Sequence, residues 1–516
     1  MITKWKLTNF RSIKDETVLD LAPLTVFTGA NSSGKSSFLK SILLISQTLS
    51  HKDSSAPLLL NGRFIKLGDF DGVVNDQSGS NTIRIGWECV PRVDVLHQVN
   101  NIMATDGRHY AKSPRAVNCE IIVDQRPGGS TPDVRHDGGF VVSGVTLGPL
   151  QVSSASDGSI RMKEEWLDVA DRQNIGIALS YDIADEDTAV GKYLIGYIGE
   201  YPPDYQVSAV GCILDGFLPS EIVLGEQWSD MDGQPVARLS SRPLSHDLAD
   251  DRQYMIDYFS GSVYYLGPLR ANPKRVYARS SHLSAGQIDL KGEHTADILE
   301  TNRDRIIRYI PSTSLSLPED NHEPIECSLL EALIDWVGYL GIAESIRTVN
   351  KGKYGIELGV TMENGVIISD LTQVGVGVSQ VLPILVTALL AEPDTTLIFE
   401  QPELHLHPKV QSCIADFFLS MTLLGKQCLV ETHSEHFINR IRLRIAEAPE
   451  ASSLRDATSI YFVEKEHGWS SFREIQIDEY GGIQVWPEGF FDEQHNETAR
   501  ILRAASLKSK KDWKDN

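Results

Sequence analysis

The sequence lacks several features that would place it outside the cell interior. It has no apolar run long enough to cross a membrane and no apolar signal-peptide core near its start. Its six cysteines show no C-x-x-C spacing, which argues against a disulfide framework or a zinc site. Basic residues are also scarce, because 48 Lys and Arg stand against 70 Asp and Glu, and the net charge of −22 disfavours indiscriminate nucleic-acid binding. We therefore expect a cytoplasmic protein without membrane contact. A local basic groove is still possible, because the net charge is an average over the whole surface.

Changes in composition and hydrophobic pattern divide the chain into four parts. A length of 516 residues favours two or more domains. Residues 1–90 look like the first half of a nucleotide-binding lobe. In 91–260, Gly, Pro, Asp and Ser interrupt short strand-like runs and no helical period is sustained, so we predict a β-rich insertion. Regular strand and helix patterns return in 261–445, and 446–516 forms a C-terminal segment with a strand pair.

One stretch predicts a ligand. Residues 29–36 fit the phosphate-binding pattern G-x-x-x-x-G-K-[ST], with a buried strand before them and a helical pattern after them. Backbone N–H groups at a helix N-terminus attract phosphate, Lys35 would reach the β- and γ-phosphates, and Ser36 would hold Mg²⁺. A chance Gly/Ser turn is the alternative. The residues expected to contact ATP here are Gly29, Ala30, Asn31, Ser32, Ser33, Gly34, Lys35, Ser36 and Ser37.

A second motif completes this site from far along the chain. Residues 396–400 are four apolar or small residues followed by Glu400, which describes a buried strand that delivers a carboxylate to Mg²⁺. Helical patterns precede this strand at about 294–309 and 327–346. After it, 427–434 reads as a strand that ends in His433, whose imidazole could hydrogen-bond the γ-phosphate or the attacking water.

Small residues before an apolar helix predict another anion site. Gly375, Gly377, Ser379 and Gln380 lie in a G-x-G-x-S-Q stretch where free backbone N–H groups would meet an anion. In a dimer this stretch could cap the γ-phosphate held by the other subunit. A flexible turn is the alternative.

The order of these motifs resembles the ABC-type ATPases. It runs Asn9-Phe10-Arg11-Ser12, phosphate loop, G-x-G-x-S-Q, P-E-x-H-x-H-P and Thr-His-Ser. The chain looks most similar to the prokaryotic OLD-like and RecF-like branch, which is similar to SMC and Rad50 heads. Within that branch it resembles the group that carries L-G-P-x-R (residues 266–270) and a terminal W-P-x-G-F-F-D (residues 486–492). The resemblance implies an α/β ATPase head, a mixed sheet with helices, split by a large β-rich insertion. It also implies ATP-dependent head-to-head dimers or higher homo-oligomers, Arg11 on the nucleotide and His433 as the switch histidine.

One departure from that pattern affects catalysis. The usual pair is Asp followed by Glu, whereas this chain has Glu400 followed by Gln401. Gln401 can orient a water but cannot take its proton, and a general base contributes about 10²–10⁴-fold. ATP binding is therefore better supported than hydrolysis, unless Glu403 or His433 substitutes. His405 and His407 could bind a metal, but in this setting a role in shaping the loop is favoured.

The sequence favours a switch over an effector. No D-x-D pair follows His433, as it would in OLD-type nucleases. The resemblance implies the sensor or switch subunit of an anti-phage defence system, acting on a separate nuclease or toxin. A DNA-maintenance clamp, in which the ATP-bound dimer holds DNA, is the second interpretation. A nuclease acting alone and a transporter ATPase are weaker ones.

Overall fold

The fold is known from a computed structural model of the chain. The structure describes residues 1–51, 57–91, 116–125, 140–148, 150–153, 179–180, 206–279, 290–316, 322–362, 366–368, 371–373, 377–448, 451–485, 487, 497–498 and 500–505. Among these residues, no helix is both long enough and apolar enough to span a membrane.

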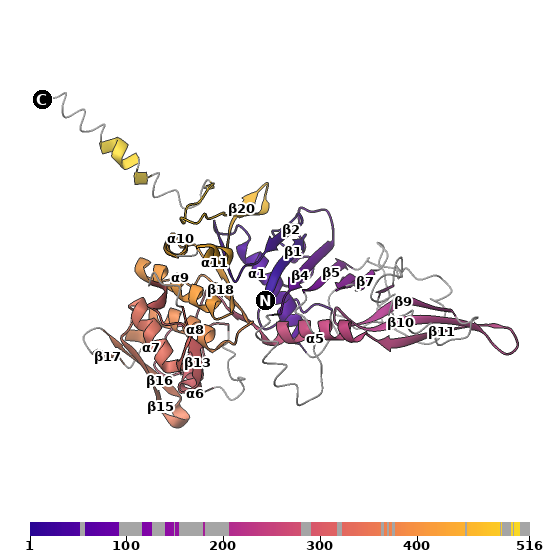
Figure 1. Ribbon diagram of the computed structural model, residues 1–516, viewed down its shortest axis with the longest axis horizontal. Coiled ribbons are helices and arrows are strands. Elements are labelled where there is room, and N and C mark those ends of the chain that lie inside the picture. Colours follow the sequence, from indigo (N-terminus) through magenta and orange to yellow (C-terminus); the bar gives the residue numbers. More distant parts are fainter. Residues whose placement is uncertain are drawn as a thin grey trace.

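A mostly parallel sheet forms the centre of the molecule (Figure 1). Its strands, in spatial order, are β12 (Val263–Leu266), β18 (Thr396–Glu400), β19 (Gln427–Glu431), β3 (Leu24–Gly29), β20 (Thr458–Glu466) and β21 (Trp469–Glu474). The first five strands are parallel to their neighbours, and β21 is antiparallel to β20. Because the strands are parallel, the carboxyl ends of β18, β19 and β3 meet at one edge, where open α/β sheets bind ligands.

Side chains of the central strands alternate between two hydrophobic cores. On β3, Leu24 and Val26 belong to one core and Phe27 to the other. Buried on both faces, these strands read as continuous apolar runs, which is how the sequence revealed them. The first core includes side chains from α7 (Leu329–Leu340), α8 (Gly377–Leu390), α9 (Pro408–Leu423) and α10 (Glu435–Glu447), and the second includes those of α1 (Lys35–Leu49) and α5 (His246–Gly261).

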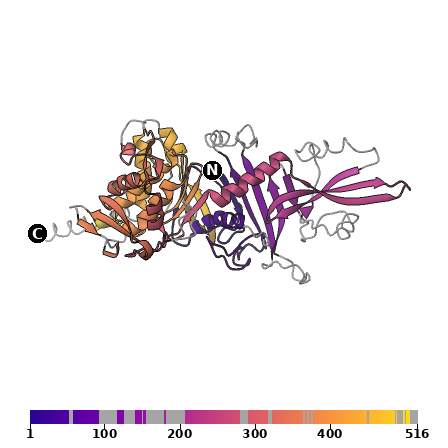
Figure 2. The same ribbon diagram turned by 90° about the horizontal axis from the view of Figure 1, so that it is seen from below.

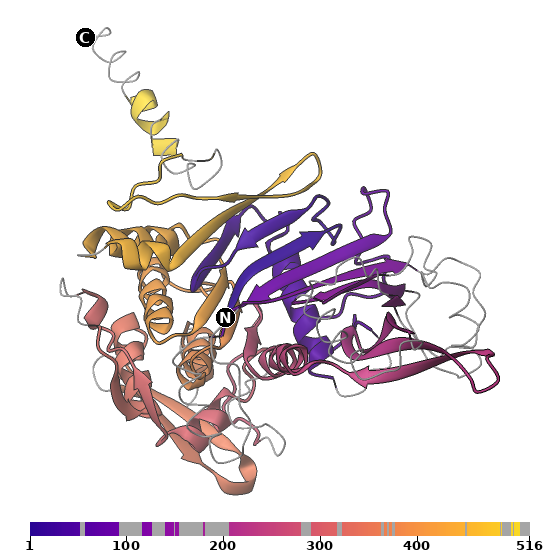
Figure 3. The same ribbon diagram turned by 45° about the vertical axis from the view of Figure 1, so that its right-hand side comes forward.

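A second, antiparallel sheet extends away from the first (Figure 3). Its ten strands, in spatial order, are β11 (Pro235–Pro243), β10 (Leu218–Ser229), β9 (Gln206–Asp215), β8 (Leu179–Ser180), β7 (Leu150–Ser153), β6 (Phe140–Leu147), β5 (Val117–Gln125), β4 (Thr82–Cys89), β1 (Ile2–Thr8) and β2 (Thr17–Asp20). The boundary expected at residue 90 falls between β4 and β5, which pair directly. The β-rich segment therefore continues the N-terminal sheet, and the predicted mixed α/β class with a large β-rich insertion is confirmed.

Helix α5 corrects the expectation that 91–260 holds no helix. It crosses one face of the antiparallel sheet and also contacts α1 (Figure 2). Its buried residues include Leu248, Met255 and Phe259, whose spacing gives one helical face. The charged run Asp250-Asp251-Arg252 lies between them, so the apolar period is weak and was missed.

The remaining elements lie mainly between β12 and β18. They are α6 (Thr295–Asn302), β13 (Ile306–Tyr309), β14 (Ile325–Ser328), β15 (Ser345–Asn350), β16 (Ile356–Met362) and β17 (Val366–Ile368), with α11 (Ala451–Asp456) before β20. The helices predicted at 294–309 and 327–346 are therefore too long. Each stops early and a strand follows, because β13 pairs with β14 and β15 pairs with β16.

Candidate nucleotide site

The phosphate loop joins β3 to α1 and depends on two glycines. Gly29 has φ +135° and Gly34 has φ +110°, a region that favours glycine. A Cβ atom on Gly29 would lie 2.1 Å from the Val463 carbonyl oxygen, and one on Gly34 would lie 1.9 Å from Ser470 Oγ. The loop therefore requires glycine at both positions for conformation and for space.

Neighbouring segments hold the loop from behind. The Ser470 hydroxyl donates to the Ser33 carbonyl at 2.6 Å, and the Ser470 amide donates to the Ser12 carbonyl at 2.7 Å. Ser12 Oγ donates in turn to Ser37 Oγ at 3.1 Å. The tip of the loop, formed by Ala30, Asn31 and Ser32, is exposed. The loop is thus braced on its inner side and open on its outer side, where a phosphate would approach.

Arg11 lies in the turn that carries Ser12 to this loop. It has φ +51°, its amide donates to the Val73 carbonyl at 2.6 Å, and its own carbonyl accepts a hydrogen bond from Asn75. Its side chain is partly exposed. The structure places Arg11 next to the loop in the chain, and its contact with nucleotide stays a prediction.

Lys35 lies at the centre of the loop. Its side chain is buried, and its Nζ donates to the carbonyls of Gly29 at 3.1 Å and Ala30 at 2.7 Å. Burial lowers the pKa of Lys35, while the nearby Glu431 and Glu403 carboxylates oppose this effect. An ammonium cradled by the loop's own carbonyls is placed to meet a phosphate that enters the loop.

Two buried carboxylates end adjacent strands beside this lysine. Glu400 on β18 and Glu431 on β19 are register partners. Tyr265 donates its hydroxyl to Glu400 Oε1 at 3.1 Å, and Ser36 donates to Glu431 Oε2 at 2.7 Å. Burial, followed by the charge of Glu431, raises the pKa of Glu400 to about 7, and burial also raises the pKa of Glu431. The sequence reasoning missed Glu431.

Ser36 and this pair of carboxylates have the chemistry to hold a magnesium ion. Carboxylate and hydroxyl oxygens are the hard ligands that Mg²⁺ prefers, and Mg²⁺ keeps waters and phosphate oxygens in its remaining positions. The expected ligands Ser36 and Glu400 lie on facing elements of the site, with Glu431 hydrogen-bonded to Ser36. Within the described residues, no group of three or more His, Cys, Asp or Glu residues could hold a metal alone. A metal ion here would therefore be coordinated by these side chains together with water and phosphate oxygens.

Arg270 fixes the turn that follows Glu400. It is 6% exposed, and its guanidinium donates to the carbonyls of Glu400 at 3.0 Å and Gln401 at 3.2 Å. Burial lowers its pKa to about 10. Gln401 has φ +46°, and its amide donates to the Glu431 carbonyl at 2.7 Å. The L-G-P-x-R motif had no assigned task in the sequence, and here its arginine holds the backbone of the turn after Glu400.

Glu403 and His433 form the third part of the site. Glu403 is 7% exposed and accepts the His433 amide at 2.7 Å through Oε1, while Oε2 is buried with no hydrogen-bond partner among the described residues. Burial raises the pKa of Glu403. Burial, followed by the charge of Lys35, lowers the pKa of His433 and favours its neutral imidazole. The strand β19 ends at Glu431, so His433 lies two residues beyond the strand that was predicted to end on it.

The two histidines after Glu403 shape the loop. His405 is exposed and has φ +64°. His407 is the N-cap of α9, and its Nδ1 accepts the Lys409 amide at 3.3 Å. These contacts agree with the favoured interpretation of the P-E-x-H-x-H-P motif.

The predicted trans signature is only partly within the described chain. Gly375 lies outside the described residues. Gly377 begins α8, where a Cβ would contact Leu406 at 3.5 Å, and Ser379 and Gln380 are buried in the first turn. The prediction that these residues meet the nucleotide of another subunit remains a prediction.

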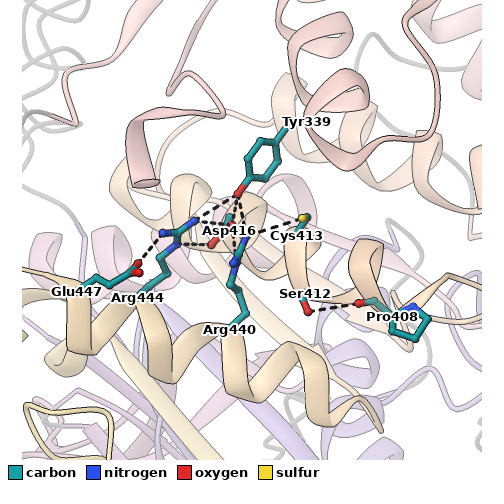
Figure 4. Close-up of polar contacts among 8 residues, drawn as sticks. All are labelled: Tyr339, Pro408, Ser412, Cys413, Asp416, Arg440, Arg444 and Glu447. Carbon is teal, nitrogen blue, oxygen red and sulfur yellow. Dashed lines mark hydrogen bonds and ion pairs between the residues drawn. The ribbon is translucent and has the colours of Figure 1, made fainter. Parts of the chain in front are cut away.

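A buried ionic network joins the helices behind the site (Figure 4). Asp416 on α9 is fully buried and accepts from Arg440 Nε at 2.9 Å and Arg444 Nε at 2.8 Å, both on α10. Tyr339 on α7 donates its hydroxyl to the same carboxylate. Since α9 follows the Glu400 turn and α10 follows His433, the network fixes the helices that extend from both sides of the site.

Comparison with family models identifies the chain. Residues 1–124 and 282–438 match the family described as AAA ATPase domain. These segments make up more than half of the chain, which therefore belongs to the AAA ATPase domain family. Residues 455–501 match a second model, described as a protein of unknown function (DUF3696). None of the curated proteins matches the chain.

Solved structures similar to this chain include SMC heads. An SMC head bound to the C-winged helix domain of ScpA has 12% identity and a TM-score of 0.39, with 92% of this chain and 98% of that chain covered. The SMC head domain from Thermotoga maritima has 9% identity and a TM-score of 0.34, with 92% and 99% covered. The Pyrococcus furiosus Smc head with an extended coiled coil, bound to the C-terminal domain of ScpA, has 11% identity and a TM-score of 0.38, with 97% and 99% covered. Values this low do not establish a shared function.

Proposed function

We propose that this chain is an ATP-binding, slowly hydrolysing ABC-type ATPase of the OLD-like branch. It acts as the sensor or switch subunit of a prokaryotic anti-phage defence system and controls a separate effector. The observation that carries the nucleotide part is the meeting of Lys35, Ser36 and the Glu400–Glu431 pair at one sheet edge. Membership of the AAA ATPase domain family supports it independently.

Each group at the sheet edge has a task in this proposal. The loop amides and Lys35 bind the phosphates of ATP, and Ser36 and Glu400 hold the Mg²⁺, which neutralises charge on the β- and γ-phosphates. Gln401 orients the attacking water. Glu403 is the group that accepts the water's proton, because it is a buried carboxylate beside His433 whose pKa is raised by burial.

The switch role follows from weak hydrolysis and from what the sequence does not contain. A site that binds ATP but has Gln401 in place of a carboxylate holds the bound state for a long time. The sequence shows no nuclease motif, so the output of the switch is assigned to another protein, a nuclease or toxin. Dimerisation through the ATP site, with Gly377 and Ser379 of one subunit facing Lys35 and Ser36 of the other, is the change of state that the effector would read.

The mass of the purified chain tests this switch. We expect ATP with Mg²⁺ to convert monomers into dimers or higher homo-oligomers, as measured by light scattering, and Lys35→Ala to prevent the change. The product of the adjacent gene should then bind one of the two states better than the other. A mass that does not respond to ATP would contradict the switch.

A DNA clamp is the alternative function. The net charge of −22 disfavours DNA binding, so a clamp would require a local basic groove on the ATP-bound dimer. Salt-sensitive binding of duplex DNA that requires ATP would favour the clamp over the defence switch. Metal-dependent cleavage of DNA by the purified chain would instead favour a nuclease acting alone.

A further inference from the structure

Glu431 is the buried acid that the nucleotide motifs do not account for. It is 4% exposed at the end of β19, directly opposite Glu400 on β18. Its Oε2 accepts the hydroxyl hydrogen of Ser36 at 2.7 Å. Ser36 is the phosphate-loop residue expected to hold Mg²⁺. The hydrogen bond therefore places the Glu431 carboxylate next to the metal position from the strand beside Glu400.

A divalent cation would stabilise two adjacent buried carboxylates. Burying an ionised carboxylate is unfavourable, and a second carboxylate beside it adds repulsion. Lys40 and Lys35 carry charge close to the pair, but Lys35 Nζ is directed to the carbonyls of Gly29 and Ala30. A divalent ion between Ser36 and the two acids would offset the remaining negative charge.

Gln401, the residue after Glu400, is neutral, and its backbone amide donates to the backbone carbonyl of Glu431. Glu431 is therefore the acid that the structure places beside Glu400 at this edge of the sheet. We infer that Glu431 is a second carboxylate ligand of the magnesium site, beside Ser36 and Glu400. The inference rests on the proposed ATP site and adds a metal ligand to it.

A purely structural role makes a different prediction. If Glu431 only accepts the Ser36 hydrogen bond, a glutamine at 431 keeps an acceptor oxygen and preserves the function. If Glu431 binds the metal, glutamine loses the charge and metal affinity falls. Glu431→Gln separates the two roles with almost no change in volume.

The chain offers a matched control far from the site. Glu226 on β10 is 5% exposed and accepts the Ser240 hydroxyl at 2.7 Å, so it repeats the Ser–Glu pair in the antiparallel sheet. Glu226→Gln makes the same chemical change without touching the nucleotide site. Both variants are compared with the wild-type full chain, and thermal unfolding confirms that each one folds.

The experiment measures binding of a fluorescent ATP analogue as Mg²⁺ is titrated, and counts bound Mn²⁺ by electron paramagnetic resonance. For Glu431→Gln we expect the half-saturating metal concentration to rise at least about tenfold, as is common when a metal site loses a supporting acid. Analogue affinity in the presence of a chelator should stay within a few-fold of wild type. Glu226→Gln should match wild type in both measurements.

The outcomes separate this inference from the proposed ATP site. Equal metal dependence in Glu431→Gln and wild type, with normal analogue binding, would overturn the metal role and leave the ATP site intact. A failure of wild type to bind the analogue at all would overturn both.

Discussion

Under the proposed function, Gln401 limits how fast the site hydrolyses ATP. Its backbone is fixed on both sides, because its amide donates to the Glu431 carbonyl and its carbonyl accepts from Arg270. Its side chain carries an amide in place of a carboxylate, so in the proposed mechanism it positions the water and leaves the proton transfer to Glu403.

Gln401→Glu should accelerate hydrolysis. The backbone contacts of residue 401 do not depend on its side chain, so the new carboxylate would occupy the same turn. Restoring a general base is worth on the order of 10²-fold or more in kcat. Phosphate-release kinetics measure the gain, with analogue binding as the control for affinity. An unchanged rate would show that Gln401 does not limit turnover.

Glu403→Gln should slow the residual hydrolysis at least about tenfold and leave ATP binding intact. Glu403 must be deprotonated to act as a base, and burial raises its pKa above the usual range. Wild-type turnover should therefore increase with pH through the acid range as Glu403 loses its proton, and the variant should lack this dependence. A variant with wild-type turnover and the same pH profile would exclude Glu403.

Much of this site could be predicted from local patterns. The phosphate loop and Glu400 each follow a short motif, and the structure brings both to one sheet edge. Glu431 could have been found by the rule that found Glu400, since Gln427–Glu431 is also an apolar strand that ends in an acid. Arg270 could not be assigned a task, because its contacts are with backbone carbonyls 130 or more residues away.

The Asp416 network fixes the helices that leave the site. Asp416 on α9 binds both Arg440 and Arg444 on α10, and Tyr339 ties α7 to the same carboxylate (Figure 4). The side chain of Arg444 is only 5% exposed, and its charge is balanced by Asp416 and by Glu447 at 2.7 Å. The contacts hold α7, α9 and α10 in one arrangement around the first core.

Asp416→Ala should destabilise the protein by about 3–5 kcal/mol, because it leaves the buried guanidinium of Arg444 with only the half-exposed Glu447 as an ionic partner. Urea unfolding measures the loss. The control is Glu464→Ala, which removes a partly exposed partner of Arg473 and should cost about 0–1 kcal/mol. Equal losses in the two variants would show that the Asp416 network adds no more than a surface pair.

Elements were predicted well where burial is complete and poorly where it is partial. Strands β3 and β18 are apolar on both faces and were located within a residue or two. Helix α5 exposes one face, so its charged residues hide the period that packs against the antiparallel sheet. The helices near 294 and 327 were extended too far, because the strands that follow them are defined by pairing with β14 and β16 rather than by local sequence.

The molecule as a whole combines the two sheets through their shared second core. Because β4 pairs with β5, the insertion extends the sheet formed by the first 90 residues. Composition alone had predicted a boundary between the two segments. The hairpin of β10 and β11 projects from the end of this sheet farthest from the central strands (Figure 2). The nucleotide site lies where the chain's start and its last third meet, so it forms only in the folded chain.

The most direct test of the ATP site is calorimetric titration of the full chain with ATP and Mg²⁺. We expect saturable binding by wild type and loss of binding in Lys35→Ala, because Lys35 is the cation at the centre of the phosphate loop. Glu226→Gln serves as the remote control and should bind as wild type does. Retained ATP affinity in Lys35→Ala, or no binding by wild type, would contradict the assignment of this site.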